Sequence, residues 1–188
     1  ITFNNIKNDN DNILTLIDLA GHEKYLKTTM YGLNGLFVDY GLIVIGSNMG
    51  INKMTKEHIS IMLYLKIPFT VVLTKIDICP DHVYERVLRN IKKLLNLPLF
   101  NKKPYELKNP KIDIDKFLEL GNYSNFVPII TISNKTGHNI DHLRSLLNML
   151  QPRIKFDLTD MVGSLMYIDS KFYVNGIGIV ISGTVKGD

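Results

Sequence analysis

The sequence has 188 residues, of which 45% are hydrophobic and 21% charged, a composition that indicates a folded globular chain and excludes a disordered one. Its formal net charge of +4 is mildly basic, so contact with RNA is permitted but not indicated. No apolar run approaches the length of a membrane span, and the single cysteine, Cys79, excludes an intrachain disulfide and suits a reducing compartment.

The first residues predict a β-hairpin. Residues 1–6 and 13–18 are strand-forming runs, and the polar stretch 7–12 between them is typical of a turn. The second run is aliphatic, so we expect a buried strand there. Because the chain opens at Ile1, without methionine and within a strand-like segment, we expect it to be a fragment of a longer protein.

Strand and helix patterns then alternate along the chain. The predicted strands are short apolar runs of the kind that is buried on both faces, and they cover residues 40–46, 69–74 and 127–132. The predicted helices carry apolar residues at helical spacing, and they cover residues 23–31, 55–65, 81–95 and 140–150. We expect Thr55 and Asn139 to cap the second and fourth helices. Residues 32–35, which include two glycines, are expected to end the first helix.

Two stretches depart from this alternation. Residues 101–125 contain scattered lysines, prolines and a glycine, and they predict a loop-rich insertion with a short strand near Ile112. After a boundary at residues 151–153 the pattern becomes all-β. Short strands are predicted there at residues 166–168, 172–174 and 179–185. We therefore expect two domains, residues 1–152 and residues 153–188.

A first candidate motif, Asp18-Leu19-Ala20-Gly21-His22, follows the strand predicted at residues 13–18. In open α/β sheets, ligands bind at the carboxyl ends of strands. There Asp18 can hold Mg²⁺ through water, Gly21 can bring its N–H against a phosphate, and His22 can position a water molecule. Asp-x-x-Gly also occurs by chance in many chains, so the motif alone does not establish a site.

A second motif, Thr74-Lys75-Ile76-Asp77, ends the strand predicted at residues 69–74. A carboxylate such as Asp77 can accept both donors of the guanine edge, N1–H and the 2-amino group, and adenine has no such edge. Lys75 can lay its aliphatic stem along the plane of a base. The alternative is a solvated lysine and aspartate at the end of a strand.

A third motif, Ser133-Asn134-Lys135-Thr136-Gly137, follows the strand predicted at residues 127–132. Its small polar groups and amides can contact guanine O6, and Ser133 can brace Asp77. The alternative is a polar loop that only begins the next helix. The three motifs together indicate a site more strongly than any one of them, because each ends a predicted strand and helices separate them.

With these motifs the chain resembles the translational GTPases, the family of elongation factor Tu and elongation factor one-alpha. D-x-x-G-H, (N/T)-K-x-D and S-x-K match the third, fourth and fifth nucleotide-binding signatures of that family. Three stretches look most like the GTP-binding protein one/two group: residues 19–29, 31–33 and 48–51. Residues 54–58 resemble the T-x-E-H helix start of the family, and residues 175–185 look like the opening of its β-barrel domain.

The resemblance implies an α/β GTPase domain of the P-loop NTPase type over residues 1–152, followed by the start of a β-barrel domain over residues 153–188. It implies that the protein hydrolyses GTP to GDP and phosphate with Mg²⁺ as cofactor. The implied partners of this nucleotide switch are the ribosome and tRNA or another RNA. The protein is expected to be a cytoplasmic monomer without membrane contact.

The family's site residues carry over to the positions that match its motifs. His22 is implied to orient the attacking water, Gly21 to hold the γ-phosphate through its N–H, and Asp18 to hold Mg²⁺ through water. The residues implied to bind GTP are Asp18, Gly21, Thr74, Lys75, Asp77, Ser133, Asn134 and Lys135.

Two features depart from the family pattern. Thr74 stands where most GTPases have asparagine, as it also does in the GTP-binding protein one/two group. No phosphate loop of the form G-x-x-x-x-G-K-[ST] occurs in the chain, and switch I is not identifiable. Both are expected before Ile1, so these 188 residues alone are predicted to bind GTP weakly or not at all and not to hydrolyse it.

Two other functions are compatible with the pattern. A non-hydrolysing nucleotide sensor or scaffold would have no need of His22, and an ATP-dependent enzyme of the same fold is disfavoured by Asp77. The remaining histidines show no metal-ligand pattern, and surface or capping roles are expected for His58, His82, His138 and His142. Cys79 is expected to be a small buried apolar residue.

Overall fold

The computed structural model describes residues 14–35, 37–119, 125–153 and 163–186. The chain divides into two compact units, which are described separately below. The first comprises Ile1–Asp18 and Tyr40–Gln151, and the second Leu19–Asp39 and Pro152–Asp188. No helix among the described ranges is both long and apolar enough to cross a lipid bilayer. The domains predicted at residues 1–152 and 153–188 stay a prediction.

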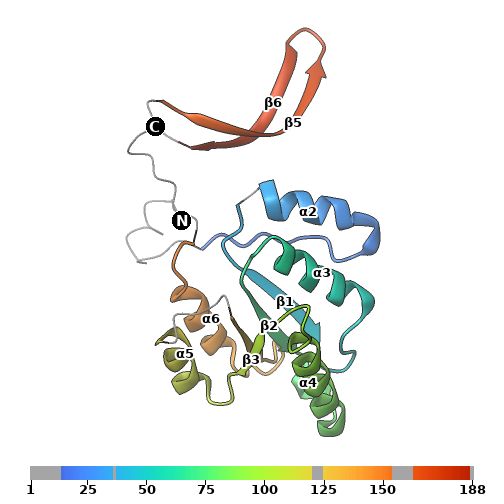
Figure 1. Ribbon diagram of the computed structural model, residues 1–188, viewed down its shortest axis with the longest axis vertical. Coiled ribbons are helices and arrows are strands. Elements are labelled where there is room, and N and C mark those ends of the chain that lie inside the picture. The colour runs from blue at the N-terminus through green and yellow to red at the C-terminus, as the bar shows by residue number, and fades with distance from the viewer. Residues whose placement is uncertain (1–13, 36, 120–124, 154–162, 187–188) are drawn as a thin grey trace. The chain divides into compact units, whose positions relative to one another are not determined.

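The first unit is built on a parallel four-stranded sheet with the strand order β1-β2-β4-β3 (Figure 1). Its strands are β1 (Gly41–Gly46), β2 (Phe69–Thr74), β3 (Lys103–Glu106) and β4 (Phe126–Thr131). At the centre, Val71 of β2 lies opposite Ile43 of β1 and Ile129 of β4. Branched and aromatic side chains suit such a pleated, buried surface. The strands predicted at residues 40–46, 69–74 and 127–132 are therefore confirmed.

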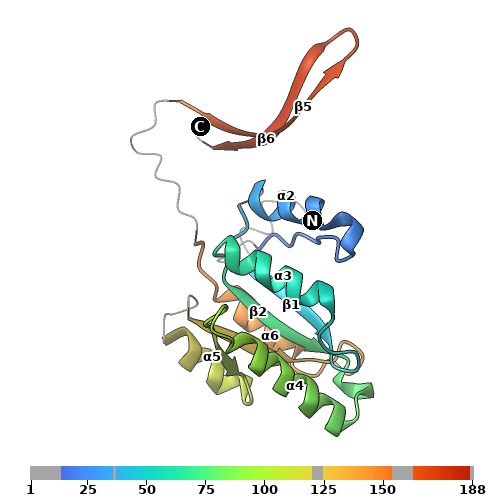
Figure 2. The same ribbon diagram turned by 45° about the vertical axis from the view of Figure 1, so that its right-hand side comes forward.

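Helices cover both faces of this sheet (Figure 2). They are α3 (Lys53–Tyr64), α4 (Asp81–Leu95), α5 (Pro110–Glu119) and α6 (Ile140–Asn148). On the face of α5 and α6, one cluster joins side chains of the sheet, of both helices and of the residue after β3: Val72, Leu107, Ile114, Ile130, Ile132 and Leu146. On the other face, Met62 of α3 lies against Gly41 of β1. The result is a sheet between two layers of helices, which confirms the α/β fold class expected from the resemblance.

Helix α4 confirms the apolar stripe seen in its sequence. Val87, Leu88, Ile91 and Leu95 are buried, and the outward positions are charged. Pro80, with φ −60°, precedes the helix and suits its start because proline has no N–H to leave unpaired. The turn after β1 packs against this helix through Gly50, which has φ +75°. A Cβ there would lie 3.0 Å from Val87 Cγ2, so glycine meets both requirements.

At the starts of α3 and α6 the side-chain contacts differ from the caps expected from the sequence. The N-cap of α3 is Asn52, and Thr55 completes a capping box, with the Thr55 N–H donating to Asn52 Oδ1 at 2.7 Å. Asn139 occupies the N-cap position of α6, but its side chain makes no cap bond. Its Nδ2 instead donates to the Thr131 carbonyl at 2.9 Å. The position of Asn139 at the start of α6 is thus confirmed, whereas the prediction that Thr55 caps α3 is wrong because Asn52 is the N-cap.

The prediction that residues 40–46 are buried on both faces of the sheet is correct for one face and wrong for the other. Ile43 and Ile45 are buried, whereas Val44 is 63% exposed on the opposite face. Among the described strands β1 lies at the edge of the sheet, and the apolar cluster under α5 and α6 is centred on β2 and β4.

The predicted loop-rich insertion at residues 101–125 is also wrong over its described part. It contains β3, which pairs in parallel with β4, and helix α5, which includes Ile112. Its two prolines occupy positions that tolerate them. Pro104 lies on an edge strand, and Pro110 is the first residue of α5, where the Asn109 N–H donates to the Asp113 carboxylate at 2.8 Å.

The buried strand predicted at residues 13–18 is wrong for residues 14–18, and the other half of the predicted hairpin lies outside the described residues. This segment has no strand pairing, and Leu14, Leu16 and Ile17 are 47%, 72% and 40% exposed. A β-strand depends on a neighbouring strand for its hydrogen bonds, and none of the described strands pairs with this segment.

The second unit contains helical and β segments. The 3₁₀ turn η1 (Glu23–Tyr25) leads into α2 (Leu26–Gly35), so residues 32–35 do not end the helix as predicted. The segments from both ends of this unit touch, because the Arg153 N–H donates to the Asp39 carboxylate at 2.8 Å and the Phe37 ring meets Tyr167 edge to face.

Strands β5 (Leu165–Val174) and β6 (Gly178–Lys186) form an antiparallel hairpin (Figure 1). The two short strands predicted at residues 166–168 and 172–174 are one strand, irregular between Ile168 and Ser170. Gly183 lies opposite this irregularity, where the Tyr167 carbonyl leaves no room for a Cβ. Antiparallel strands of this kind agree with the expected start of a β-barrel domain.

The core of the first unit gives a direct test of this packing. Leu146→Ala removes a fully buried side chain from the cluster under α5 and α6, so we expect the free energy of unfolding to fall by about 2–5 kcal/mol. Leu99→Ala is the matched control, because Leu99 is 86% exposed and should cost less than about 0.5 kcal/mol. Equal losses for both variants in urea unfolding would contradict the packing described here.

Candidate nucleotide-binding site

The site forms where β2 and β4 end. The two strands pair in parallel with Leu73 opposite Thr131, and one further bond, from the Ile132 N–H to the Leu73 carbonyl at 2.7 Å, extends the pairing. The loops that follow therefore leave the same edge of the sheet side by side. One carries Asp77 and the other Ser133, as the sequence predicted.

The two loops are joined by a hydrogen bond between Ser133 and Asp77. The Ser133 hydroxyl donates to Asp77 Oδ1 at 2.6 Å. Ser133 is fully buried, whereas the Asp77 side chain is exposed, so the bond fixes an accessible carboxylate from a rigid base. A carboxylate offers about four lone-pair sites, so most of its acceptor capacity stays available to a ligand.

This contact also favours the ionised form of Asp77. The Ser133 hydroxyl lowers the pKa of the Asp77 carboxyl below its ordinary value, with smaller contributions in the same direction from the Asp77 backbone and Lys135. Desolvation opposes the shift without reversing it. Asp77 is therefore ionised at neutral pH and acts as a hydrogen-bond acceptor only.

The Ser133 loop is ordered by its own backbone. The Gly137 N–H donates to the Ser133 carbonyl at 2.9 Å, and the Ser133 N–H donates to the His138 carbonyl at 3.1 Å. The Thr136 N–H donates to the Ser133 hydroxyl at 3.2 Å, so this hydroxyl both accepts and donates. Asn134 and Lys135 stand exposed on the outside of the loop, where a ligand can reach them.

Thr74 and Lys75 shape the other side of the site. Lys75 adopts a left-handed conformation with φ 62°, and its exposed side chain lies near Gly46 at the end of β1. This turn carries the chain from β2 into the short 3₁₀ turn η2 (Ile76–Ile78) that holds Asp77. The Thr74 hydroxyl donates to the Ile45 carbonyl at 3.4 Å, so it is turned towards the neighbouring strand.

The residues of the first motif are placed differently. Asp18 is exposed at the end of the irregular segment of the first unit, whereas Gly21 and His22 belong to the second unit. His22 caps η1, because its Nδ1 accepts the Lys24 N–H at 3.2 Å. The Thr29 hydroxyl donates to the Ala20 carbonyl at 2.6 Å and so holds this turn against α2.

The structure thus brings together one part of the predicted site. Thr74, Lys75, Asp77 and the Ser133 loop form a single constellation at the edge of the sheet. In the described ranges no group of three or more His, Cys, Asp and Glu side chains is arranged to hold a metal ion. Cys79 is buried, as predicted, and burial raises the pKa of its thiol.

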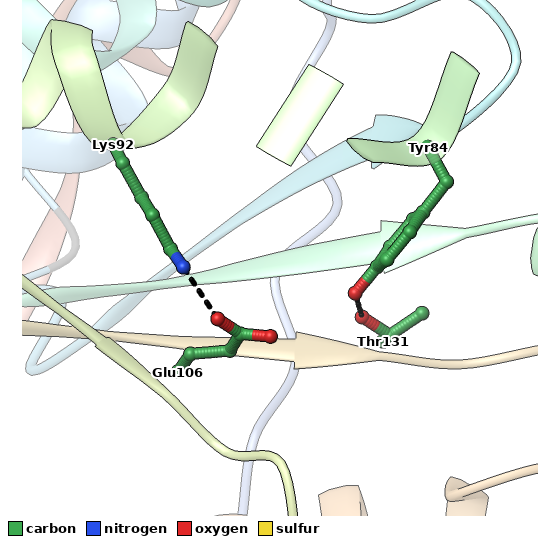
Figure 3. A network of polar contacts seen from close by, with 4 residues as sticks. All are labelled: Tyr84, Lys92, Glu106 and Thr131. Carbon is green, nitrogen blue, oxygen red and sulfur yellow. Dashed lines mark hydrogen bonds and ion pairs between the residues drawn. The ribbon is translucent and has the colours of Figure 1, made fainter. Parts of the chain in front are cut away.

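Sequence reasoning missed two polar contacts behind this constellation (Figure 3). Tyr84 of α4 forms a hydrogen bond of 3.1 Å with Thr131 at the end of β4. Lys92 in the last turn of α4 pairs with Glu106 of β3 at 2.5 Å. No spacing in the sequence indicates either partner, since both contacts join elements that are distant along the chain.

Known proteins are similar to this chain in sequence. Residues 1–156 match the protein family described as elongation factor Tu GTP binding domain. GTP-binding protein 1 of Xenopus laevis is 42% identical over 174 residues, which are 92% of this chain and 26% of that protein. The selenocysteine-specific elongation factor of Methanocaldococcus jannaschii is 32% identical over 174 residues, 92% of this chain and 31% of that protein.

A solved structure is also similar to this chain. Translation elongation factor SelB of Methanococcus maripaludis, in complex with the GTP analogue GPPNHP, aligns with a TM-score of 0.59 and 25% identity over 90% of this chain and 32% of that one. The chain therefore spans about a quarter to a third of the length of these relatives.

The Ser133–Asp77 contact gives a pH-dependent prediction. In Ser133→Ala the pKa of Asp77 should rise towards its ordinary value, because the strongest stabiliser of the ionised form is lost. Since the pKa of Asp77 is lowered in the folded protein, its stabilising contribution is present above the ordinary aspartate pKa and is lost as the pH falls through the folded value. NMR titration of the carboxyl carbon checks this, and an unshifted pKa in the variant would contradict it.

Proposed function

The chain belongs to the family of elongation factor Tu GTP-binding domains. We therefore propose that the protein works as a translational GTPase and that Asp77 recognises the guanine base of the bound GTP. The observation that carries this proposal is the hydrogen bond of 2.6 Å by which buried Ser133 holds the exposed Asp77 carboxylate. A carboxylate held in this way can accept the N1–H and the 2-amino group of guanine together.

The rest of the constellation fits a purine nucleotide. The exposed Lys75 side chain can cover one plane of the base with its aliphatic stem, and its left-handed backbone turns the chain so that Asp77 follows at once. Asn134 and Lys135 offer polar groups to the guanine O6. The Thr74 hydroxyl is hydrogen-bonded to β1, so we assign only the backbone of Thr74 to contact with the nucleotide.

We assign the phosphate side of the nucleotide to the first motif. Mg²⁺ is commonly bound by one or two carboxylates together with phosphates and water. Asp18 offers a single exposed carboxylate, so it fits an ion held mainly by the phosphates of a nucleotide. Bound there, the ion would neutralise charge on the phosphates. Gly21 is exposed and has no side chain, so a phosphate oxygen can approach its N–H closely.

For hydrolysis of GTP to GDP and phosphate, we assign the orientation of the attacking water to His22. Its Nδ1 accepts the Lys24 N–H, so a neutral imidazole carries its proton on Nε2. The exposed Nε2–H can then donate to a water molecule and fix its direction. Capping of η1 in this way gives the ring a defined orientation before any ligand binds.

The names of the relatives support a role in translation. The protein from M. jannaschii and the solved structure from M. maripaludis are named as elongation factors. We therefore propose that the switch acts on the ribosome and a tRNA or another RNA in the cytoplasm. The mildly basic charge of the chain is compatible with such partners.

The role of His22 is tested by two substitutions in the full-length protein. His22→Ala should slow GTP hydrolysis by about 10²–10⁴-fold with little change in GTP affinity, because the side chain acts mainly in the transition state. His22→Asn keeps an acceptor at the cap position but cannot reach the water, so it should be equally slow. Normal turnover in His22→Asn would make His22 a capping residue only, and parallel losses of binding and turnover would make it structural.

The base assignment is tested by Asp77→Asn. One acceptor oxygen becomes an amide donor facing the guanine 2-amino group, so GTP binding should weaken by about 1.5–3 kcal/mol. Xanthine carries an acceptor oxygen at that position, so preference should move to xanthosine nucleotides. Calorimetric titration with both nucleotides measures the change. Unaltered GTP affinity in the variant would remove Asp77 from the site.

A further inference from the structure

The hydrogen bond between Tyr84 and Thr131 joins the same two chain segments as the bond between Asp77 and Ser133. Tyr84 lies in the first turn of α4, directly after the loop that carries Asp77. Thr131 is the last residue of β4, directly before the loop that carries Ser133. Figure 3 shows the Tyr84 ring reaching from the helix to the end of this strand, where the two oxygens lie 3.1 Å apart.

We propose that Tyr84 and Thr131 are positioning residues for guanine recognition. Their bond closes a ring that runs from Asp77 along the chain to Tyr84, across to Thr131, along the chain to Ser133, and back across to Asp77. This inference rests on the proposed function of Asp77 as the reader of the base.

A second connection is needed because the first one acts on an exposed group. Asp77 stands on a short 3₁₀ turn, and the Ser133 hydroxyl ties it to the opposite loop. A single hydrogen bond allows the carboxylate to pivot about it. Two connections, one within the turn at Asp77 and one after it at Tyr84, fix both the distance and the direction of the carboxylate. A bidentate contact with a planar base requires both.

Thr131 is a firm anchor for this second connection. Its carbonyl accepts the Asn139 side chain at 2.9 Å, so the residue is held through its backbone as well as its hydroxyl. Asn139, with φ 55°, begins α6 on the far side of the Ser133 loop. Tyr84 is partly buried, and burial raises the pKa of its phenol, so the hydroxyl is neutral and keeps its proton.

The pair of Lys92 and Glu106 provides a matched comparison. It also ties α4 to the sheet, but it joins the last turn of the helix to β3 and touches neither base-binding loop (Figure 3). If bonds between α4 and the sheet only hold the helix in place, the two ties should have the same effect on ligand selectivity. Positioning of Asp77 requires that only the Tyr84 tie affects it.

The experiment compares GDP with IDP, which lacks the 2-amino group, in the full-length protein. Tyr84→Phe and Thr131→Val each remove one hydroxyl and little volume. Each should reduce the preference for GDP over IDP by about 2- to 10-fold, the equivalent of one hydrogen bond. Thr131→Ser retains the hydroxyl and should keep the preference. Lys92→Met removes the other tie and should also keep it.

The outcomes separate the inference from the proposed function. An unchanged GDP/IDP ratio in Tyr84→Phe, or an equal loss of affinity for both nucleotides, would overturn the positioning role. Asp77→Ala is measured alongside, and it should abolish the preference for GDP. If Asp77→Ala kept that preference, the proposed base reader itself would be wrong, whatever Tyr84 does. A reduced ratio in Tyr84→Phe and Thr131→Val, with Thr131→Ser and Lys92→Met unchanged, supports the inference.

Discussion

Parallel pairing of β2 with β4 is the constraint from which the candidate site follows. It sets Leu73 beside Thr131 and lets the Ile132 N–H extend the pairing by one more bond, so two loops leave the sheet together. Both strands are buried on both faces, so a slip by one residue would exchange the side chains that pack against the two helical layers and disrupt both. The polar chemistry of the Asp77 and Ser133 loops therefore depends on the packing of two mainly apolar strands.

The site combines an exposed charged group with a buried support. Ser133 is inaccessible, yet it directs the Asp77 carboxylate and lowers its pKa. Tyr84 and Thr131 add a second connection, between the helix that follows the Asp77 loop and the strand that precedes the Ser133 loop. An accessible acceptor that is already ordered does not have to lose rotamer freedom when a ligand arrives, which favours selective binding. Ser133, Tyr84 and Thr131 thus order the site, and the exposed Asp77 is the group that a ligand can reach.

Sequence patterns predicted the parts of this structure that local chemistry determines. Continuous apolar runs located the buried strands, and the residues following them, Asp77 and Ser133, located the site. The strand expected at residues 13–18 failed because strand formation depends on a neighbouring strand, which a hydrophobic run does not specify. The contact between Tyr84 and Thr131 depends on the crossing of α4 over β4, so no local spacing could reveal it. The same holds for β3, whose short sequence gains its role only through pairing with β4.

The central claim is that the Asp77 carboxylate selects guanine by its two ring-edge donors. The most direct measurement is a calorimetric titration of the unmodified full-length protein with GDP and with ADP, which differ only in the base. Adenine lacks both donors, so two charge-assisted hydrogen bonds are lost, and GDP should bind at least about 10²-fold more tightly than ADP. Equal dissociation constants for GDP and ADP would contradict the account.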